Sequence, residues 1–418
     1  MSGARLFNRD RAARLLHRDG IDGLVGTSIE NVIYMTGHDN PTHQINRGVH
    51  ILGLFTPGQA PEATAIIPAL EAETFLSSAV GIGEVYLIGQ FNRTPGDAAE
   101  MDDRGRASAA LVAAAHSVPT AIEGLVDALT RRGLQRGRIA VDEFGLPVTG
   151  WHALQAALPG AEIVPGAALL WEVRMVKTAE EVRRLRRASL ITEQAVMQAM
   201  RQVRPGMRDT DLQRIFCSSV AMQDGKPTFT MFATGSLTAQ PHLLTADKVI
   251  APRDLIRWDV GCTYGHYHSD TARAVVLGEP TARQRNNWAA LSDGVEAALG
   301  GIRPGADPAH LFDLAMAPGH SAGLRAHSRF HCGHGVGITV YDPPVVTASD
   351  PAKSVFLMPR PEGGLEAGMV INIEVGHYIQ GEEGYLCEDT VLVTDTGYER
   401  LTSAPHELSL DRFLAGTA

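Results

Sequence analysis

The amino-acid sequence predicts an α/β domain over residues 1–168, followed by a second domain over residues 169–418 that contains long helices and paired strands. Three observations lead to this prediction. A chain of 418 residues exceeds one ordinary domain, for which about 150 residues is a guide. Short apolar runs alternate with helical patterns up to residue 165. A strong helix start near residue 178 then opens a region of different character.

The first domain shows the alternation of strands and helices that defines its class. The predicted elements are, in order, a helix at 9–20, strands at 22–28, 31–37, 50–56 and 63–68, a helical stretch at 107–133 and a strand at 138–143. This order is typical of an α/β domain with a mostly parallel or mixed sheet.

The second domain begins with a long amphipathic helix. Thr178 and Glu181 have the T-x-x-E spacing of a capping box, which marks a helix N-terminus. The apolar residues that share one helical face are Val182, Leu185, Ala188, Ile191 and Ala195. We therefore place the domain boundary near residues 166–176.

A weak internal repeat occurs within the second domain. Arg-Pro-Gly stands at residues 204–206 and again at 303–305, an offset of 99 residues. Each copy follows a long helical pattern, and each places a leucine at the same phase, Leu212 and Leu311. A tandem duplication with a cleft between its halves would produce this pattern. Two independent but similar helix starts are the alternative.

Charge and terminal composition limit the classes of partner. The formal net charge of −10 makes nucleic acid and anionic membranes unexpected partners. The N-terminal residues lack the apolar stretch of a secretory signal, and no apolar run reaches membrane-spanning length. The four cysteines show no paired spacing of a zinc or disulfide framework. We therefore expect a cytoplasmic protein with reduced thiols.

Two acidic residues lie in neighbouring strand patterns. Residues 254–277 predict two strands joined by a glycine-containing turn, with Asp259 in the first strand and Asp270 in the second. Antiparallel pairing allows both carboxylates to lie on one side of the sheet. A divalent metal between them is the simplest relief of their repulsion.

Two further acids stand in apolar strands near the C-terminus. Glu374 lies in the strand pattern 368–376, and Glu388 lies in the pattern 384–394. Acidic residues are rarely buried without a partner, so their apolar neighbours favour a functional reason. For either strand alone, an acid at a sheet edge is an equal alternative.

His334 stands between these segments, flanked by Gly333, Gly335 and Gly337. We expect a glycine-rich turn that leaves backbone room for a close approach, although an isolated histidine there is more often structural. Four carboxylates and one imidazole suit two divalent ions, and favour manganese, cobalt, iron or zinc over calcium. Two such ions about 3–4 Å apart can share a water and lower its pKa, which predicts hydrolysis.

Four motifs carry a family resemblance. WDVGCTYGHYHSDTAR, GHGVG, MVINIE and EDTVLVT follow one another in this order. Together they resemble the pita-bread metallopeptidases, the family of methionine aminopeptidase, aminopeptidase P and prolidase. The resemblance covers about residues 170–405 and implies an α+β pita-bread domain with a pseudo-twofold duplication.

The resemblance implies a role for each candidate residue. One ion would be bound by Asp259, the other by His334 and Glu374, and both by the bridging residues Asp270 and Glu388. Glu374 would also move a proton while a metal-bridging hydroxide attacks the substrate. His242 matches the family's substrate-facing histidine, with a structural loop residue as the alternative. Manganese is the first metal expected.

The N-terminal domain is similar to that of the two-domain branch, which includes prolidase, aminopeptidase P, creatinase and ectoine hydrolase. This similarity implies a homodimer and a loop near the substrate. The candidate contact residues in that loop are His38, Asp39, His43 and Arg47. A solvated polar loop is the alternative.

The chain departs from the peptidases after the GHGVG motif. The peptidases usually carry His-Glu before a proline, whereas this chain has Tyr341, Asp342 and Pro343. Tyr341 remains a candidate substrate contact, but it cannot become a cation near neutral pH. His266 and His268 share the strand phase of Asp270 and are further candidates, with solvent exposure as the alternative.

The first functional expectation is a dinuclear metal-dependent hydrolase, acting as an Xaa-Pro dipeptidase or an aminopeptidase-P-like peptidase. Because Tyr341 and Asp342 stand where the peptidases usually carry His-Glu, the alternative function is a hydrolase or lyase that acts on a small amide or a related small molecule. A non-catalytic binding protein is a third possibility. The complete ligand set argues against that third class and against a creatinase.

Overall fold

The computed structural model describes residues 4–94, 100–349 and 358–416. The chain forms two compact units, Met1–Arg174 and Met175–Ala418. The division thus falls six residues after the predicted boundary at 168, within helix α8 (Ala167–Met175). The domain limits 1–168 and 169–418 remain a prediction.

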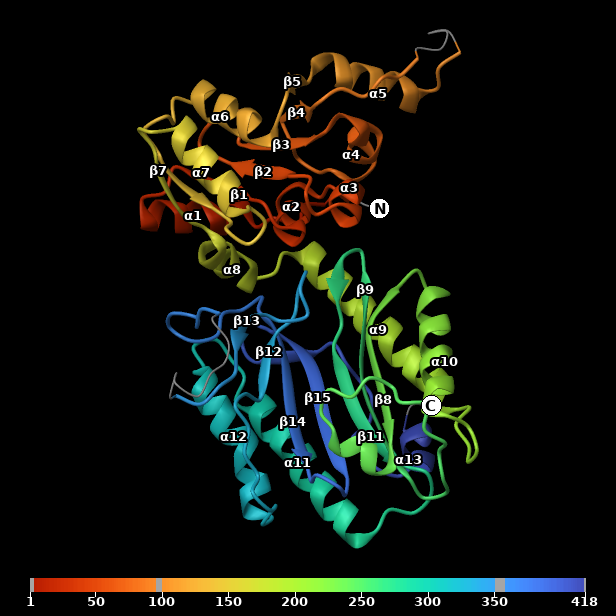
Figure 1. Ribbon diagram of the computed structural model, residues 1–418. Coiled ribbons are helices and arrows are strands. Elements are labelled where there is room, and N and C mark those ends of the chain that lie inside the picture. The colour runs from red at the N-terminus through yellow and green to blue at the C-terminus, as the bar shows by residue number, and fades with distance from the viewer. Residues whose placement is uncertain (1–3, 95–99, 350–357, 417–418) are drawn as a thin grey trace. The chain divides into compact units, whose positions relative to one another are not determined.

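A mixed seven-stranded sheet organises the first unit, in the order β5-β4-β3-β2-β1-β6-β7 (Figure 1). Its strands are β1 (Gly23–Gly26), β2 (Leu52–Phe55), β3 (Ala63–Pro68), β4 (Glu84–Ile88), β5 (His116–Val118), β6 (Arg138–Val141) and β7 (Glu162–Pro165). Strand β2 pairs antiparallel with β1 and β3, whereas the outer pairs are parallel. The predicted α/β class and mixed sheet are confirmed.

Helices surround this sheet. They are α1 (Arg9–Asp19), α2 (Ile29–Thr36), α3 (Pro41–Ile45), α4 (Ala72–Ser78), α5 (Asp103–Ala114), α6 (Ala121–Arg131), α7 (Val148–Ala157) and α8, with a 3-10 turn at Ala69–Glu71. The helix predicted at 9–20 is confirmed as α1. The long stretch predicted at 107–133 is interrupted by β5, because Pro119 has no N–H to continue a helix and Thr120 caps α6.

The strand predicted at residues 31–37 is wrong, because this segment belongs to helix α2. A short apolar run fits a buried strand and a buried helix equally well. The ends decide the outcome: Ser28 accepts a hydrogen bond from the backbone N–H of Asn31, and Gly37 ends the helix in the left-handed conformation at φ 72°.

The first half of the second unit packs two helices on a four-stranded antiparallel sheet. Its elements are α9 (Ala179–Met200), α10 (Asp209–Ala221), β8 (Lys226–Thr234), a 3-10 turn (Gly235–Ala239), β9 (Leu255–Tyr264), β10 (Tyr267–His268) and β11 (Thr271–Val276). The predicted capping box of α9 is present, with both Thr178 and Glu181 hydrogen bonds formed. Leu185 and Ile191 on its predicted apolar face are fully buried.

The second half repeats this plan with a five-stranded antiparallel sheet. Its elements are α11 (Ala282–Gly300), α12 (Pro308–Ser321), β12 (Gly333–Gly335), β13 (Asp342–Val345), β14 (Val370–Tyr378), β15 (Gly384–Val393) and β16 (Tyr398–Arg400). The last helix, α13 (Leu410–Ala415), packs against α9 and β11 of the first half. Figure 1 shows α11 and α12 beside this sheet. Leu212 and Leu311 are both buried in equivalent second helices, although the duplication itself remains a prediction.

The two sheets meet at β11 and β15, and this contact brings the acidic strands together. The backbone carbonyl of Asp270 accepts hydrogen bonds from Asn372 Nδ2 (3.2 Å) and Thr390 Oγ1 (3.1 Å). Buried Arg273 donates to the carbonyl of Glu388 and pairs with Asp389. Of the helices in the described part of the chain, none has the length and apolar character required to cross a membrane.

Candidate metal centre and its cavity

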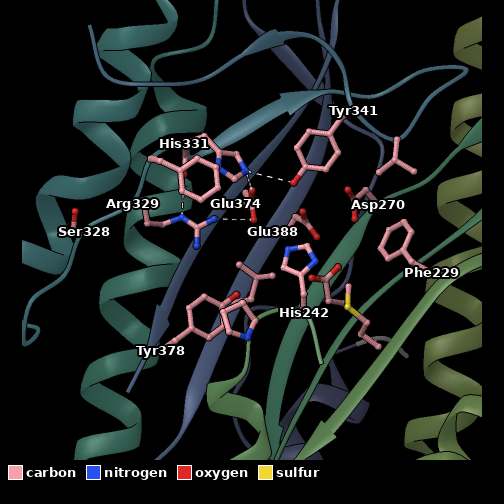
Figure 2. Close-up of a pocket in the computed structure, with 16 residues that line it drawn as sticks. Phe229, His242, Asp270, Ser328, Arg329, His331, Tyr341, Glu374, Tyr378 and Glu388 are labelled. Carbon is pink, nitrogen blue, oxygen red and sulfur yellow. Dashed lines mark hydrogen bonds and ion pairs between the residues drawn. The ribbon is translucent and has the colours of Figure 1, made fainter. Parts of the chain in front are cut away.

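A cavity of about 450 Å³ opens in the second unit, between its two sheets (Figure 2). Its ionisable lining residues are Asp259, Asp270, Glu374 and Glu388 together with His242, Arg329 and His331. Its other walls are largely apolar and aromatic, formed by Phe229, Met231, Phe330, Val340, Tyr378 and Leu386. A cavity with apolar walls and a few convergent polar groups is the usual form of a small-molecule site.

Glu374 and Glu388 face each other across paired strands. They are direct partners in the antiparallel register of β14 and β15. Directly opposite side chains lie on the same face of a sheet, about 4.5–5.5 Å apart at Cβ. The alternate residues Ile373 and Val375 enter the core against α11 and α12, which directs Glu374 to the cavity. The predicted interior position of this strand is confirmed, because β14 lies between β12 and β15.

The other two acids come from the first sheet. Asp259 lies in the centre of β9, opposite Ala272 of β11. Asp270 immediately precedes β11 rather than lying within it, in the two-residue segment between the short strand β10 and β11. Both carboxyl groups line the cavity, as the predicted antiparallel pairing requires.

His334 lies in the short strand β12, where a turn was expected. Its neighbouring glycines are needed because other backbone lies against them: a Cβ at Gly333 would stand 2.2 Å from the carbonyl oxygen of Asn372, and one at Gly335 would stand 2.3 Å from that of Pro343. His334 Nδ1 lies 2.9 Å from the carbonyl of Gly335, so it can donate there. That bond leaves Nε2, 3.4 Å from Asp270 Oδ2, to serve as a ligand.

The donor atoms of Asp270, His334 and Glu388 converge tightly. One ligand atom from each lies within 4.8 Å of the other two, and all three residues are buried. Asp270 Oδ1 and Glu388 Oε2 are buried without a hydrogen-bond partner among the described residues. Unpaired buried carboxylate oxygens are costly, and an oxygen-rich set with one imidazole fits divalent metal ions.

The electrostatics of the acids support the same conclusion. Burial and the neighbouring carboxylate of Asp270 raise the pKa of Asp259 to about 8. Burial, Asp270 and Asp259 raise the pKa of Glu388 well above its ordinary value, and burial raises that of Asp270. Closely packed carboxylates resist ionising together, and a cation removes that resistance.

Glu374 behaves differently because two cationic partners contact it. Burial alone would raise its pKa, but Arg329 and His331 outweigh burial and lower it. Arg329 Nη2 lies 2.9 Å from Glu374 Oε2, and His331 Nε2 pairs with Oε1. Figure 2 shows both side chains directed at this carboxylate.

Arg329 and His331 were not predicted from the sequence. Both lie in the irregular segment between α12 and β12, and their contacts join residues about 45 positions apart. The one available signal was the position of His331 three residues before His334, which places a second imidazole beside a ligand candidate.

Tyr341 covers His334. The two rings stack with centroids 3.8 Å apart and planes inclined by 20°, and the Tyr341 hydroxyl lies 3.5 Å from His331 Nε2. The next residue, Asp342, is buried and pairs with buried Lys177, with Nζ and Oδ2 3.4 Å apart. Tyr341 therefore forms part of the cavity wall as well as a cover for the imidazole.

The remaining histidine candidates divide into two groups. His242 is exposed on a loop and lines the cavity, so it can reach a molecule bound there. His266 and His268 are not among the lining residues. His266 occupies the turn before β10 at φ 73°, and the backbone N–H of His268 donates to Gly337.

The N-terminal loop candidates are fixed within the first unit. His38 is fully buried and its Nε2 lies 2.5 Å from Glu71 Oε2. His43 is buried in α3, and burial and Arg47 lower its pKa. Arg47 is exposed, and Asp39 accepts a hydrogen bond from Gln44 at 3.0 Å. These contacts hold His38 within the first unit, and substrate contact by the four candidates remains a prediction.

Known proteins resemble the chain over both units. The model of metallopeptidase family M24 matches residues 183–395, and that of the creatinase/prolidase N-terminal domain matches residues 9–176. The Xaa-Pro dipeptidase of Pyrococcus furiosus is 33% identical over 239 residues, which is 57% of this chain and 66% of that protein. The Xaa-Pro dipeptidase of Pyrococcus horikoshii is 31% identical over 57% of this chain and 65% of its own length. Both matches thus span less than two thirds of the relative.

Solved structures show the same fold. An X-Pro aminopeptidase from Thermotoga maritima aligns with a TM-score of 0.73 at 21% identity, covering 96% of this chain and 98% of that one. The prolidase from Pyrococcus horikoshii aligns with a TM-score of 0.74 at 24% identity, covering 96% and 99%. The expected pairing of a creatinase-type N-terminal domain with a pita-bread domain is confirmed. With its family model covering the residues that build the cavity, the chain belongs to metallopeptidase family M24.

Proposed function

We propose that the protein is a dinuclear metal-dependent hydrolase, acting as an Xaa-Pro dipeptidase or an aminopeptidase-P-like peptidase. The observation that carries the proposal is the convergence of Asp270, His334 and Glu388 within 4.8 Å, with Asp259 and Glu374 lining the same cavity. The two dipeptidase relatives support the substrate class.

The five residues have distinct parts in the proposed centre. Asp259 would hold one ion and His334 with Glu374 the other, while Asp270 and Glu388 contact both. Bound there, two divalent ions, manganese first among them, would polarise a substrate carbonyl and lower the pKa of a water. The unpaired oxygens of Asp270 and Glu388 support this assignment.

Two residues would handle charge and protons during the reaction. Glu374, kept ionised by Arg329 and His331, would accept a proton and pass it to the leaving nitrogen. His242, exposed at the cavity wall, would donate a hydrogen bond to the negative charge that develops on the substrate.

Tyr341 favours a second candidate, the hydrolysis or elimination of a small amide or related molecule. Its ring stacks on His334 and lines the cavity, and it offers no cation to a peptide. A substrate with an apolar body would suit the walls formed by Phe229, Phe330 and Tyr378.

A substrate panel on metal-reconstituted protein separates the two candidates. The panel contains Xaa-Pro dipeptides, longer Xaa-Pro peptides and small amides, and Glu374→Ala serves as the inactive control. Turnover of Xaa-Pro peptides supports the peptidase proposal, whereas turnover confined to small amides supports the second candidate. A homodimer and a cytoplasmic location remain predictions, and sedimentation of the purified protein tests the dimer.

A further inference from the structure

A buried arginine lies on the strand that carries Asp259. Arg257 is 1% exposed and stands two residues before Asp259 in β9. The intervening Trp258 packs into the core formed with α9 and α10, so Arg257 and Asp259 share the opposite face of the strand. The Arg257 guanidinium lies over the ring of Tyr378, with Cζ 5.4 Å from the ring centroid. Arg257 is therefore close to two residues that line the cavity, although it does not line the cavity itself.

Ordinary packing does not explain why this arginine is buried. Its Nη1 atom has no hydrogen-bond partner in the described part of the chain, and no carboxylate there forms an ion pair with the guanidinium. A buried charge without a counter-charge is costly, so a specific role of Arg257 is the better explanation. Its other donor atoms indicate that role, because they bind the backbone of a single loop.

That loop carries His242, the exposed histidine of the cavity wall. It begins after the 3-10 turn that follows β8, and it has no regular secondary structure around His242. Arg257 Nη2 donates to the carbonyl oxygens of Gln240 (2.7 Å) and Pro241 (3.2 Å). The Pro241 carbonyl belongs to the peptide unit that contains the backbone nitrogen of His242. The guanidinium thus fixes the peptide plane from which His242 starts.

This contact is the hydrogen bond that holds the loop at His242. Among the described residues, those at 241–244 take part in no hydrogen bond other than the one from Arg257 to Pro241. Arg257 Nε also donates to the carbonyl oxygen of Thr238, at 3.1 Å. Thr238 Oγ1 in turn accepts a hydrogen bond from the backbone N–H of Gly384, at the start of β15, at 2.9 Å. Arg257 therefore connects the loop to a turn that is itself fixed to the second sheet.

We propose that Arg257 is a positioning residue, which keeps the imidazole of His242 directed into the cavity by holding the two carbonyls that precede it. Figure 2 shows the His242 ring directed towards the acidic residues. This inference rests on the proposed function, in which His242 donates a hydrogen bond to the substrate. A planar guanidinium suits the task because its donors point in fixed directions, whereas a lysine would keep the charge without this geometry.

Steady-state kinetics of Mn²⁺-reconstituted protein tests the role in catalysis. The substrate is an Xaa-Pro dipeptide, or the small amide of the panel if only that is turned over. We expect Arg257→Lys and Arg257→Met each to lower kcat about 10- to 100-fold with little change in KM, because a displaced catalytic group slows the reaction. In a His242→Ala background neither substitution should lower kcat further. Arg214→Lys, which alters an arginine 69% exposed on α10, is the control and should keep the wild-type kcat.

Limited proteolysis tests the contact without any activity measurement. Leu244 is 81% exposed in the loop, so chymotrypsin can cleave beside it when the loop becomes mobile. We expect cleavage at Leu243 and Leu244, identified by mass spectrometry, to be several-fold faster in Arg257→Lys than in wild type and unchanged in Arg214→Lys. The manganese content should equal that of wild type in every variant, which excludes an effect through Asp259.

A wild-type kcat in Arg257→Lys, or losses that multiply in the double variant with His242→Ala, would overturn the proposal. An unchanged cleavage rate at Leu244 or a lower manganese content would also overturn it. Failure of every substrate would refute the proposed function alone, because the cleavage rates test the Arg257 contact independently. Arg257→Met gives the same tests if a buried lysine prevents folding, which circular dichroism reveals.

Discussion

At the scale of single residues, the cavity combines three carboxylates of raised pKa with one of lowered pKa. Asp270 and Glu388 are buried, Asp259 is half-buried, and the three repel one another, whereas Glu374 has Arg329 and His331 as partners. Groups whose surroundings move their pKa values apart are suited to different roles. The three acids of raised pKa are expected to ionise together only when cations are bound, whereas Glu374 is ionised without one.

The Arg329 contact predicts a kinetic effect. We expect Arg329→Met to lower kcat/KM about 10- to 100-fold, as the loss of a partner beside a metal ligand usually does. Without the guanidinium the pKa of Glu374 rises, so the acid limb of the pH–rate profile moves to higher pH. Arg325→Met, which removes an exposed arginine, is the control and should leave the profile in place. Identical pH profiles for wild type and Arg329→Met would refute this role.

The acids of raised pKa predict how the stability of the metal-free protein depends on pH. The pKa of Asp259 is about 8 when folded and 3.8 ordinarily, so between these values the folded state binds more protons than the unfolded state. Stability therefore falls as pH rises from 5 to 8. Glu374, whose pKa is lowered, contributes a constant stabilisation across this window.

Urea denaturation of chelator-treated protein at pH 5, 6.5 and 8 measures this dependence. We expect the midpoint to fall with pH in wild type and to fall less in Glu388→Gln, which removes one of the repelling carboxylates. Reloading with Mn²⁺ should raise the midpoint most at pH 8. A wild-type midpoint that rises from pH 5 to pH 8 would contradict the prediction.

At the scale of elements, close backbone approach around β12 positions His334. Gly333 has φ 151°, and a Cβ there would collide with the Asn372 carbonyl of β14. We expect Gly333→Ala to cost about 1–3 kcal/mol of unfolding free energy and to weaken metal binding, because it separates His334 from β14. Gly300→Ala is the control, since a Cβ there meets no atom within 4 Å. Isothermal titration with Mn²⁺ measures both variants, and equal affinities would argue against this role of Gly333.

An ion pair between Lys177 and Asp342 connects the segment before α9 to strand β13. It thereby holds β13, which begins directly after Tyr341, in place. Both side chains are buried, at 0% and 1% exposure. Removing one partner of a buried ion pair costs about 3–5 kcal/mol because the buried charge that remains has lost its counter-charge. We expect Lys177→Met to lower the free energy of unfolding by this amount. The double variant with Asp342→Leu should regain part of that loss. Chemical denaturation of both variants measures the difference in their free energies of unfolding. If the second substitution simply adds to the loss of the first, the two residues are not coupled.

The elements that could be predicted from the sequence were those with local signals. The α9 start was predictable because Thr178 and Glu181 lie three residues apart, and the acidic strands because apolar neighbours surround Glu374 and Glu388. The segment 31–37 was mistaken for a strand because its ends, not its apolar run, make it a helix.

At the scale of the whole molecule, the centre depends on contacts between distant segments. Asp259 and Glu388 are 129 positions apart, and contacts such as those between β11 and β15 bring their sheets together. The family motifs made this set of ligands predictable. The contacts of Arg329 and His331 were not, since they arise from an irregular segment whose path no local pattern specifies.

The most direct test of the central claim is an anomalous difference map from crystals of the protein soaked in Mn²⁺. The account predicts two peaks about 3.5–4 Å apart, located between the carboxylates of Asp259, Asp270, Glu374 and Glu388 and the His334 imidazole. A map without a peak at these five residues, at full manganese saturation, would contradict it.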